Sequence, residues 1–109
     1  MTETFRNPIT ESGADPFVVR FEERYYYVYS TADGVFVSHA DNIHHLAQDG
    51  RCIFRPEAGK PYSKELWAPE IHFIDGDWYC YVAADDGANV NHHMYVLKST
   101  DGRPDGAYE

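Results

Sequence analysis

The chain has 109 residues, enough for one small domain with a modest core and too few for a second domain. Its 18 acidic and 9 basic residues give a formal net charge of −9, which opposes binding to nucleic-acid phosphates or anionic lipid. Aromatic residues make up 16% of the chain, including nine tyrosines, and sustained amphipathic helical patterns are almost absent. This composition predicts an all-β protein.

The first half of the chain predicts an antiparallel meander. Short runs rich in aromatic and β-branched residues predict strands at 17–21, 25–30, 35–39 and 52–54, with a short helical turn at 41–46. The turn signals between these runs, such as Asp33-Gly34, are those of tight hairpins. We therefore expect one four-stranded antiparallel sheet from this half.

The second half repeats the same order. It predicts strands at 71–74, 78–83 and 94–99, a loop at 85–93 and a turn between blades at 101–109. Four short strands repeated at about 40 to 50 residues are typical of β-propeller blades, although two hairpins of a β-sandwich would alternate similarly. We expect a partial propeller over 1–109, with antiparallel four-stranded blades at about 10–58 and 65–109.

Each predicted blade opens with an acidic residue beside a proline. Asp15 precedes Pro16 at the first strand, and Glu70 follows Pro69 at the matching strand of the second blade. The residue before a proline is pushed toward extended geometry, and a proline at the first position of a strand loses no ladder hydrogen bond. The pattern indicates carboxylates held at strand entrances, and the alternative for Asp15 is an ordinary Asp-Pro turn.

The order and spacing of six motifs resemble glycoside hydrolase family 43 over nearly the whole chain. The motifs are Asn7-Pro8-Ile9, Gly13-Ala14-Asp15-Pro16-Phe17, Tyr25-Tyr26-Tyr27, Leu66-Trp67-Ala68-Pro69-Glu70-Ile71-His72, Asp75-Gly76-Asp77-Trp78-Tyr79 and Asn91-His92-His93-Met94-Tyr95-Val96-Leu97. The resemblance implies a five-bladed propeller that hydrolyses α-L-arabinofuranosides, β-xylosides or arabinan with inversion. It also implies that Asp15 is the general base and that the general-acid glutamate comes from a later blade.

Five such blades need about 250 residues, so we expect an N-terminal fragment that carries two blades. Inverting hydrolysis needs an acid and a base roughly 6.5 to 9.5 Å apart, and one carboxylate cannot serve as both. Two functions remain open: an enzyme piece with the general-base half of a pocket for pentose-containing oligosaccharides, or a non-catalytic sugar-binding or self-assembling scaffold module. Open blade faces predict self-association or complementing blades.

Five further residues are candidates for substrate binding. Trp67 offers an aromatic face to a sugar ring, with blade packing as the alternative role. Glu70 is expected to contact substrate or tune a neighbouring charge, or else to be a turn acid. Phe17 faces either the pocket or the neighbouring blade. His92 and His93 lie in a segment that resembles a pocket loop of the family, which more often has an arginine at the position of His93.

The six histidines do not stand at spacings typical of zinc, so no metal site is expected, and the resemblance implies an axial calcium only in a complete propeller. Cys52 and Cys80 lie in apolar runs and predict reduced core thiols. The polar start Met1-Thr2-Glu3-Thr4 lacks the regions of a signal peptide, and no run is long enough to span a membrane. These features predict a cytoplasmic protein without a membrane or nucleic-acid partner.

Overall fold

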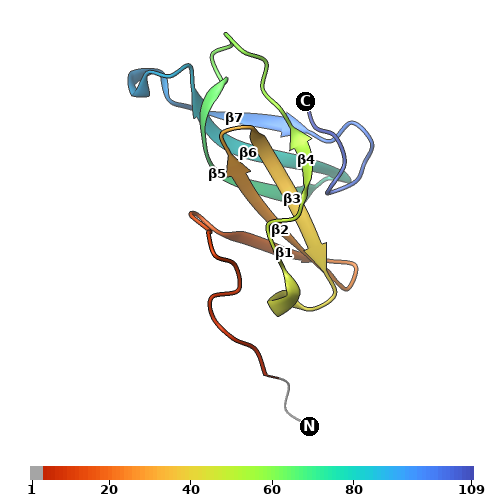
Figure 1. Cartoon of the computed structure of the whole chain (residues 1–109). Helices are drawn as coiled ribbons and strands as arrows, with labels where there is room; N and C mark the ends of the chain where they lie inside the picture. Colours follow the sequence, from red (N-terminus) through yellow and green to blue (C-terminus); the bar gives the residue numbers. More distant parts are fainter. Residues whose placement is uncertain (1–3) are drawn as a thin grey trace.

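The computed structural model describes residues 4–109, which form two antiparallel sheets (Figure 1). The first sheet contains β1 (Phe17–Phe21), β2 (Arg24–Thr31), β3 (Gly34–Ala40) and β4 (Arg51–Phe54), and the second contains β5 (Lys64–Ile74), β6 (Asp77–Asp85) and β7 (His93–Lys98). Two short 3-10 turns, η1 (Ile43–His45) and η2 (Asn89–Asn91), lie in the connections. The strand order in each sheet follows the sequence, as expected for a meander.

The first sheet has the four strands that the sequence predicts. Its tight β1–β2 turn has positive φ angles of 50° at Glu22 and 65° at Glu23, which suit the right-handed twist of a two-residue hairpin. Along β2 the side chains alternate between the two faces of the sheet. Val28 faces the second sheet, whereas Tyr27 and Tyr29 belong to a smaller cluster on the opposite face.

The strand predicted at 71–74 is longer than expected, because β5 begins at Lys64 and contains two bulges. The four residues from Lys64 to Trp67 oppose three residues of β6, and the same mismatch recurs between Trp67 and Glu70. Glu65 and Ala68 have positive φ angles of 55° and 49° at these bulges. A bulge leaves one residue outside the regular pairing, so the strand continues past the proline that was expected to open it.

The second sheet has three strands, where the sequence predicts four. The segment 101–109 was expected to lead toward another blade, but it folds back along the end of β7, where Ser99 bridges to Tyr108. The backbone N–H of Tyr108 also donates to the carbonyl of Ile53 in β4, at 2.9 Å. Tyr108 is 5% exposed, and its burial against the core holds this segment in place.

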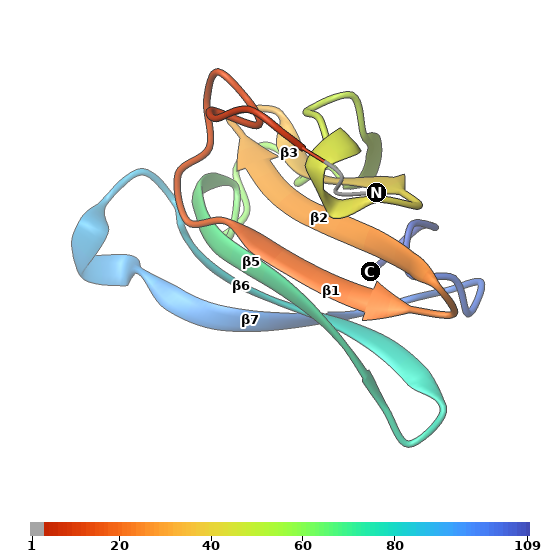
Figure 2. The ribbon, with the colours of Figure 1, turned by 90° about the horizontal axis from the view of Figure 1, so that it is seen from below.

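The main core lies between the two sheets. Its buried residues are Tyr26, Val28, Val35, Val37 and Ile53 from the first sheet, and Leu66, Ile71, Trp78, Cys80, Val82, Ala84 and Tyr108 from the second half of the chain. Figure 2 shows β1 beside β5, and these two strands are in contact. Among residues 4–109, no helix has the length and apolar character needed to cross a membrane.

Candidate active site

A cavity of about 390 Å³ has walls from both halves of the chain. The segment before β1 supplies Asp15, the end of β2 supplies Tyr29 and Ser30, and the start of β5 supplies Glu65 and Trp67. The hydroxyl of Ser30 donates to the carbonyl of Leu66 at 2.5 Å, which joins the two sheets at this wall. Two of the residues predicted for the site, Asp15 and Trp67, are therefore brought together.

Asp15 is exposed to solvent at the cavity. Its φ angle is 49°, so the extended geometry expected before Pro16 is wrong. Aspartate tolerates the left-handed region better than most residues, because its short polar side chain can interact with the local backbone. The turn directs the chain into β1 while leaving the carboxyl group of Asp15 accessible.

Trp67 is 47% exposed, and the bulges on both sides of it hold it away from the core. It lines the cavity of Asp15 and also a second hollow of about 350 Å³, which Glu70 borders. Glu70 does not line the cavity of Asp15; its Oε1 lies 3.0 Å from Nε2 of His72, two residues along the same strand. Trp67 thus lines both the cavity of Asp15 and the hollow of Glu70.

Phe17 and His93 also lie apart from the residues that line this cavity. The ring of Phe17 packs against His72 of the second sheet, with the ring centroids 5.3 Å apart. Phe17 therefore contacts the neighbouring sheet, which is one of its two expected positions. Nδ1 of His93 lies 2.7 Å from the carbonyl oxygen of Asn91 in the same loop, and the residue is exposed. The expectation that these two residues bind substrate stays a prediction.

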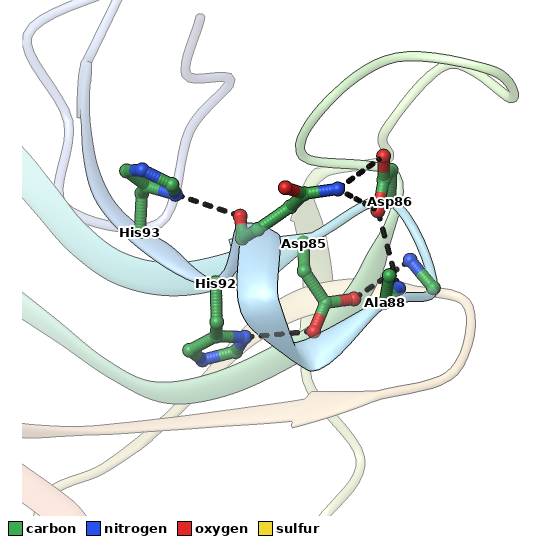
Figure 3. Close-up of polar contacts among 7 residues, drawn as sticks. Asp85, Asp86, Ala88, His92 and His93 are labelled. Carbon is green, nitrogen blue, oxygen red and sulfur yellow. Dashed lines mark hydrogen bonds and ion pairs between the residues drawn. The ribbon is translucent and has the colours of Figure 1, made fainter.

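His92 packs against Trp67, with ring centroids 4.5 Å apart and planes inclined by 44°. Its Nδ1 lies 2.9 Å from Oδ2 of Asp85, a carboxyl group that is 1% exposed (Figure 3). Oδ1 of Asp85 accepts a hydrogen bond from the N–H of Gly87 at 2.8 Å. Sequence reasoning missed Asp85, because an Asp-Asp-Gly run between strands is an ordinary turn signal.

Tyr29 and Glu65 are the other ionisable residues whose positions at this cavity the sequence did not suggest. The hydroxyl of Tyr29 accepts a hydrogen bond from the N–H of Gly50 at 2.8 Å. Burial raises the pKa of Tyr29, so its hydroxyl stays neutral and remains a hydrogen-bonding group. Glu65 adds a second carboxyl group to the wall that contains Asp15. The walls of the cavity therefore present two carboxyl groups and a neutral phenolic hydroxyl.

No group of three or more His, Cys, Asp or Glu residues is arranged to hold a metal ion in the described part of the chain. The axial calcium, which the family resemblance associates only with a complete propeller, stays a prediction. The side chains that line the cavity include carboxyl groups, hydroxyl groups and the aromatic rings of Tyr29 and Trp67.

Comparison with known proteins gives consistent results. The chain is 38% identical over 106 residues to an extracellular exo-α-(1→5)-L-arabinofuranosidase of Streptomyces avermitilis, covering 93% of this chain and 22% of that protein. It is 31% identical over 102 residues to α-L-arabinofuranosidase 43 of Humicola insolens, covering 90% and 21%. The crystal structure of an α-L-arabinofuranosidase from Lactobacillus brevis superposes with a TM-score of 0.82 at 28% identity, covering 94% and 35%. The chain thus spans about a fifth of the length of these curated relatives.

The expected cytoplasmic location is wrong, because the Streptomyces avermitilis relative is an extracellular enzyme. That expectation relied on the polar residues Met1 to Thr4, of which Met1 to Glu3 lie outside the described residues. A secretory leader is removed from a mature protein, so the first residues of a chain are weak grounds for assigning a compartment.

The predicted fold is confirmed by the antiparallel sheets and the solved structures that they match, and this chain covers part of that propeller. The blade limits at 10–58 and 65–109 stay predictions. Residues 5–109 match the family described as "Glycosyl hydrolases family 43", which confirms the resemblance seen in the motifs. The chain belongs to this family of glycosidases.

Proposed function

We propose that this chain supplies the general base and one sugar-binding wall of an inverting glycoside hydrolase that acts on arabinose-containing glycosides. The observation that carries the proposal is the cavity shared by Asp15 and Trp67. The arabinofuranosidase relatives support arabinose as the sugar, and the alternative within the family is a xyloside. The same relatives support an extracellular place of action.

In the proposed mechanism the sugar ring rests against the indole of Trp67, whose accessible face suits the apolar side of a pentose. The carboxylate of Asp15 accepts a proton from a water molecule as the oxygen of that water attacks the anomeric carbon. A carboxylic acid on the opposite face protonates the leaving glycosidic oxygen. We assign that acid to a part of the enzyme that the longer relatives contain and this chain does not span.

Glu70 lines the second hollow together with Trp67. We propose that it contacts substrate or tunes local charge, since it borders a neighbouring hollow and is paired with His72. Glu65, in the cavity itself, is the rival carboxyl group. Replacing Glu65 by Gln therefore belongs in every activity test as a control.

The test of this proposal is binding of p-nitrophenyl α-L-arabinofuranoside to the chain, followed by NMR. We expect shifts at residues around Asp15 and Trp67, and loss of those shifts in Trp67→Ala. Phe5→Ala is the matched control, because Phe5 is an aromatic residue that is 62% exposed and does not line this cavity. Binding that survives Trp67→Ala, or that is lost equally in Phe5→Ala, would contradict the proposed site.

Hydrolysis by this chain alone should be negligible, because its partner acid is assigned elsewhere. Ordinary enzymes turn over at about 1 to 10³ per second, and a rate in that range would show that the 109 residues contain both groups. If Glu65→Gln then abolished that rate, the acid would be Glu65.

A non-catalytic scaffold is the second candidate, and one observation favours it. The outer side of β7 exposes Met94 (74%) and Val96 (55%), next to Val90 (85%) in the preceding loop. Exposed apolar side chains gathered on one face of a sheet commonly mark a contact surface. We propose that this surface associates with complementing blades or with a second copy of the chain.

A further inference from the structure

The carboxyl group of Asp85 is the most deeply buried charged group that the proposed mechanism does not use. It lies at the end of β6 and is 1% exposed. One oxygen accepts the N–H of Gly87 and the other faces Nδ1 of His92. A carboxylate only accepts hydrogen bonds, so Nδ1 of His92 must carry the proton. Asp85 therefore selects the tautomer of the imidazole as well as its orientation.

The imidazole of His92 has no second hydrogen-bond partner among the described residues. Its Nε2 is buried and has no hydrogen-bond partner there. In the neutral ring with a proton on Nδ1, Nε2 carries a lone pair. The direction of the ring then depends on its bond to Asp85, and one ring face meets the indole of Trp67. Figure 3 shows His92 directed toward Asp85, whereas His93 points elsewhere in the loop.

Trp67 needs such support because of its place in the fold. It stands between Glu65 and Ala68, both with positive φ, and nearly half of its side chain is in solvent. Among residues 4–109, the ring that packs against the indole of Trp67 is that of His92. A half-exposed side chain with few neighbours samples several rotamers unless a contact selects one.

We propose that Asp85 and His92 are positioning residues that hold the indole of Trp67 at the wall of the Asp15 cavity. The hydrogen bond to Asp85 orients the His92 ring, and the contact with that ring selects the rotamer of the Trp67 indole. The proposal rests on the proposed function in one respect, namely that Trp67 is the platform for the sugar. It adds a residue, Asp85, that touches no substrate.

The first test uses the unmodified chain, so it does not depend on a variant that folds. At alkaline pH, where imidazoles are neutral, ¹⁵N NMR distinguishes a proton on Nδ1 from a proton on Nε2. We expect His92 to carry it on Nδ1. A proton found on Nε2 would overturn the proposal, because Asp85 would then not be holding the ring.

The second test compares Asp85→Asn with Asp86→Asn. Asp86 is the neighbouring exposed carboxylate, which bonds Asn91 and the N–H of Ala88 and not His92. Quenching of tryptophan emission by acrylamide reports chiefly on Trp67, because Trp78 is 1% exposed. We expect stronger quenching in Asp85→Asn and unchanged quenching in Asp86→Asn. If Asp85→Asn does not fold, His92→Ala takes its place, and the same increase is expected. Unchanged quenching in a folded Asp85 or His92 variant would refute the proposal.

Affinity separates this proposal from the proposed function. Releasing one immobilised side chain should weaken binding of p-nitrophenyl α-L-arabinofuranoside about 2- to 10-fold in Asp85→Asn. If the unmodified chain does not bind this glycoside, the proposed function fails, whereas the tautomer and the quenching still decide whether Asp85 positions Trp67. If the chain binds and Asp85→Asn binds equally well, the positioning role is refuted.

Discussion

Replacement of each tryptophan by alanine should destabilise the fold to very different extents. Trp78 is 1% exposed, and its ring meets Phe21 of β1 at 4.9 Å and Phe73 of β5 at 5.3 Å between centroids. It therefore joins the two sheets. Trp67 is 47% exposed and faces a cavity, so its replacement should affect ligand binding more than folding.

The expected losses follow from burial. Removing a fully buried tryptophan side chain costs about 3 to 5 kcal/mol, a large share of the roughly 5 to 15 kcal/mol that stabilises an ordinary domain. Trp78→Ala should therefore lose about 4 kcal/mol. Trp67→Ala loses one half-exposed ring contact, for which about 0.5 to 1 kcal/mol is expected.

The assay is urea unfolding followed by far-UV circular dichroism, which needs neither tryptophan as a reporter. All variants are compared at one protein concentration, because association shifts apparent stability. A lower midpoint with an unchanged slope reports lost stability. If Trp78→Ala is too unstable to give a folded baseline, Trp78→Phe should show a smaller loss of the same sign. Equal losses for Trp67→Ala and Trp78→Ala would refute this assignment of roles.

Three further predictions concern the thiols, alkaline pH and association. Burial raises the pKa of Cys80 to about 12, so a thiol reagent should label the partly exposed Cys52 first and Cys80 only after unfolding; equal native rates would contradict this. Burial also raises the pKa of Tyr108. A group whose pKa is higher in the folded state stabilises the fold at low pH and loses that effect as pH rises, so the free energy of unfolding should fall from pH 9 toward 12. A free energy of unfolding that stays constant over this range would contradict the prediction. Light scattering should detect association through the outer side of β7, and a compact monomer at high concentration would count against it.

Periodicity and turn signals were sufficient to predict the first sheet. The alternation around Val28 and the hairpin signals fix which residues pair, because a one-residue slip would turn the buried face to solvent. The second sheet was less predictable. Bulges at Glu65 and Ala68 depend on how β5 lies against β6, and no local propensity marks those two residues for positive φ.

The candidate site was predictable where a motif marks it and unpredictable where only the fold assembles it. Asp15 and Trp67 each stand in a motif, and the structure places both at one cavity. Asp85 comes near Trp67 only through His92, across a loop whose path depends on tertiary packing. Glu70 lines a second hollow with Trp67, on a strand whose bulges the sequence does not predict.

The most direct test of the central claim is Asp15→Asn in a propeller completed with the missing blades in cis or in trans. The substitution keeps the shape of the side chain and removes the proton acceptor. Turnover should fall about 10² to 10⁴-fold while affinity for p-nitrophenyl α-L-arabinofuranoside survives, as expected for loss of a general base. Glu70→Gln in the same assembly should weaken binding more than it slows the chemical step. Near-normal turnover in Asp15→Asn, or turnover abolished by Glu70→Gln with binding intact, would contradict the account.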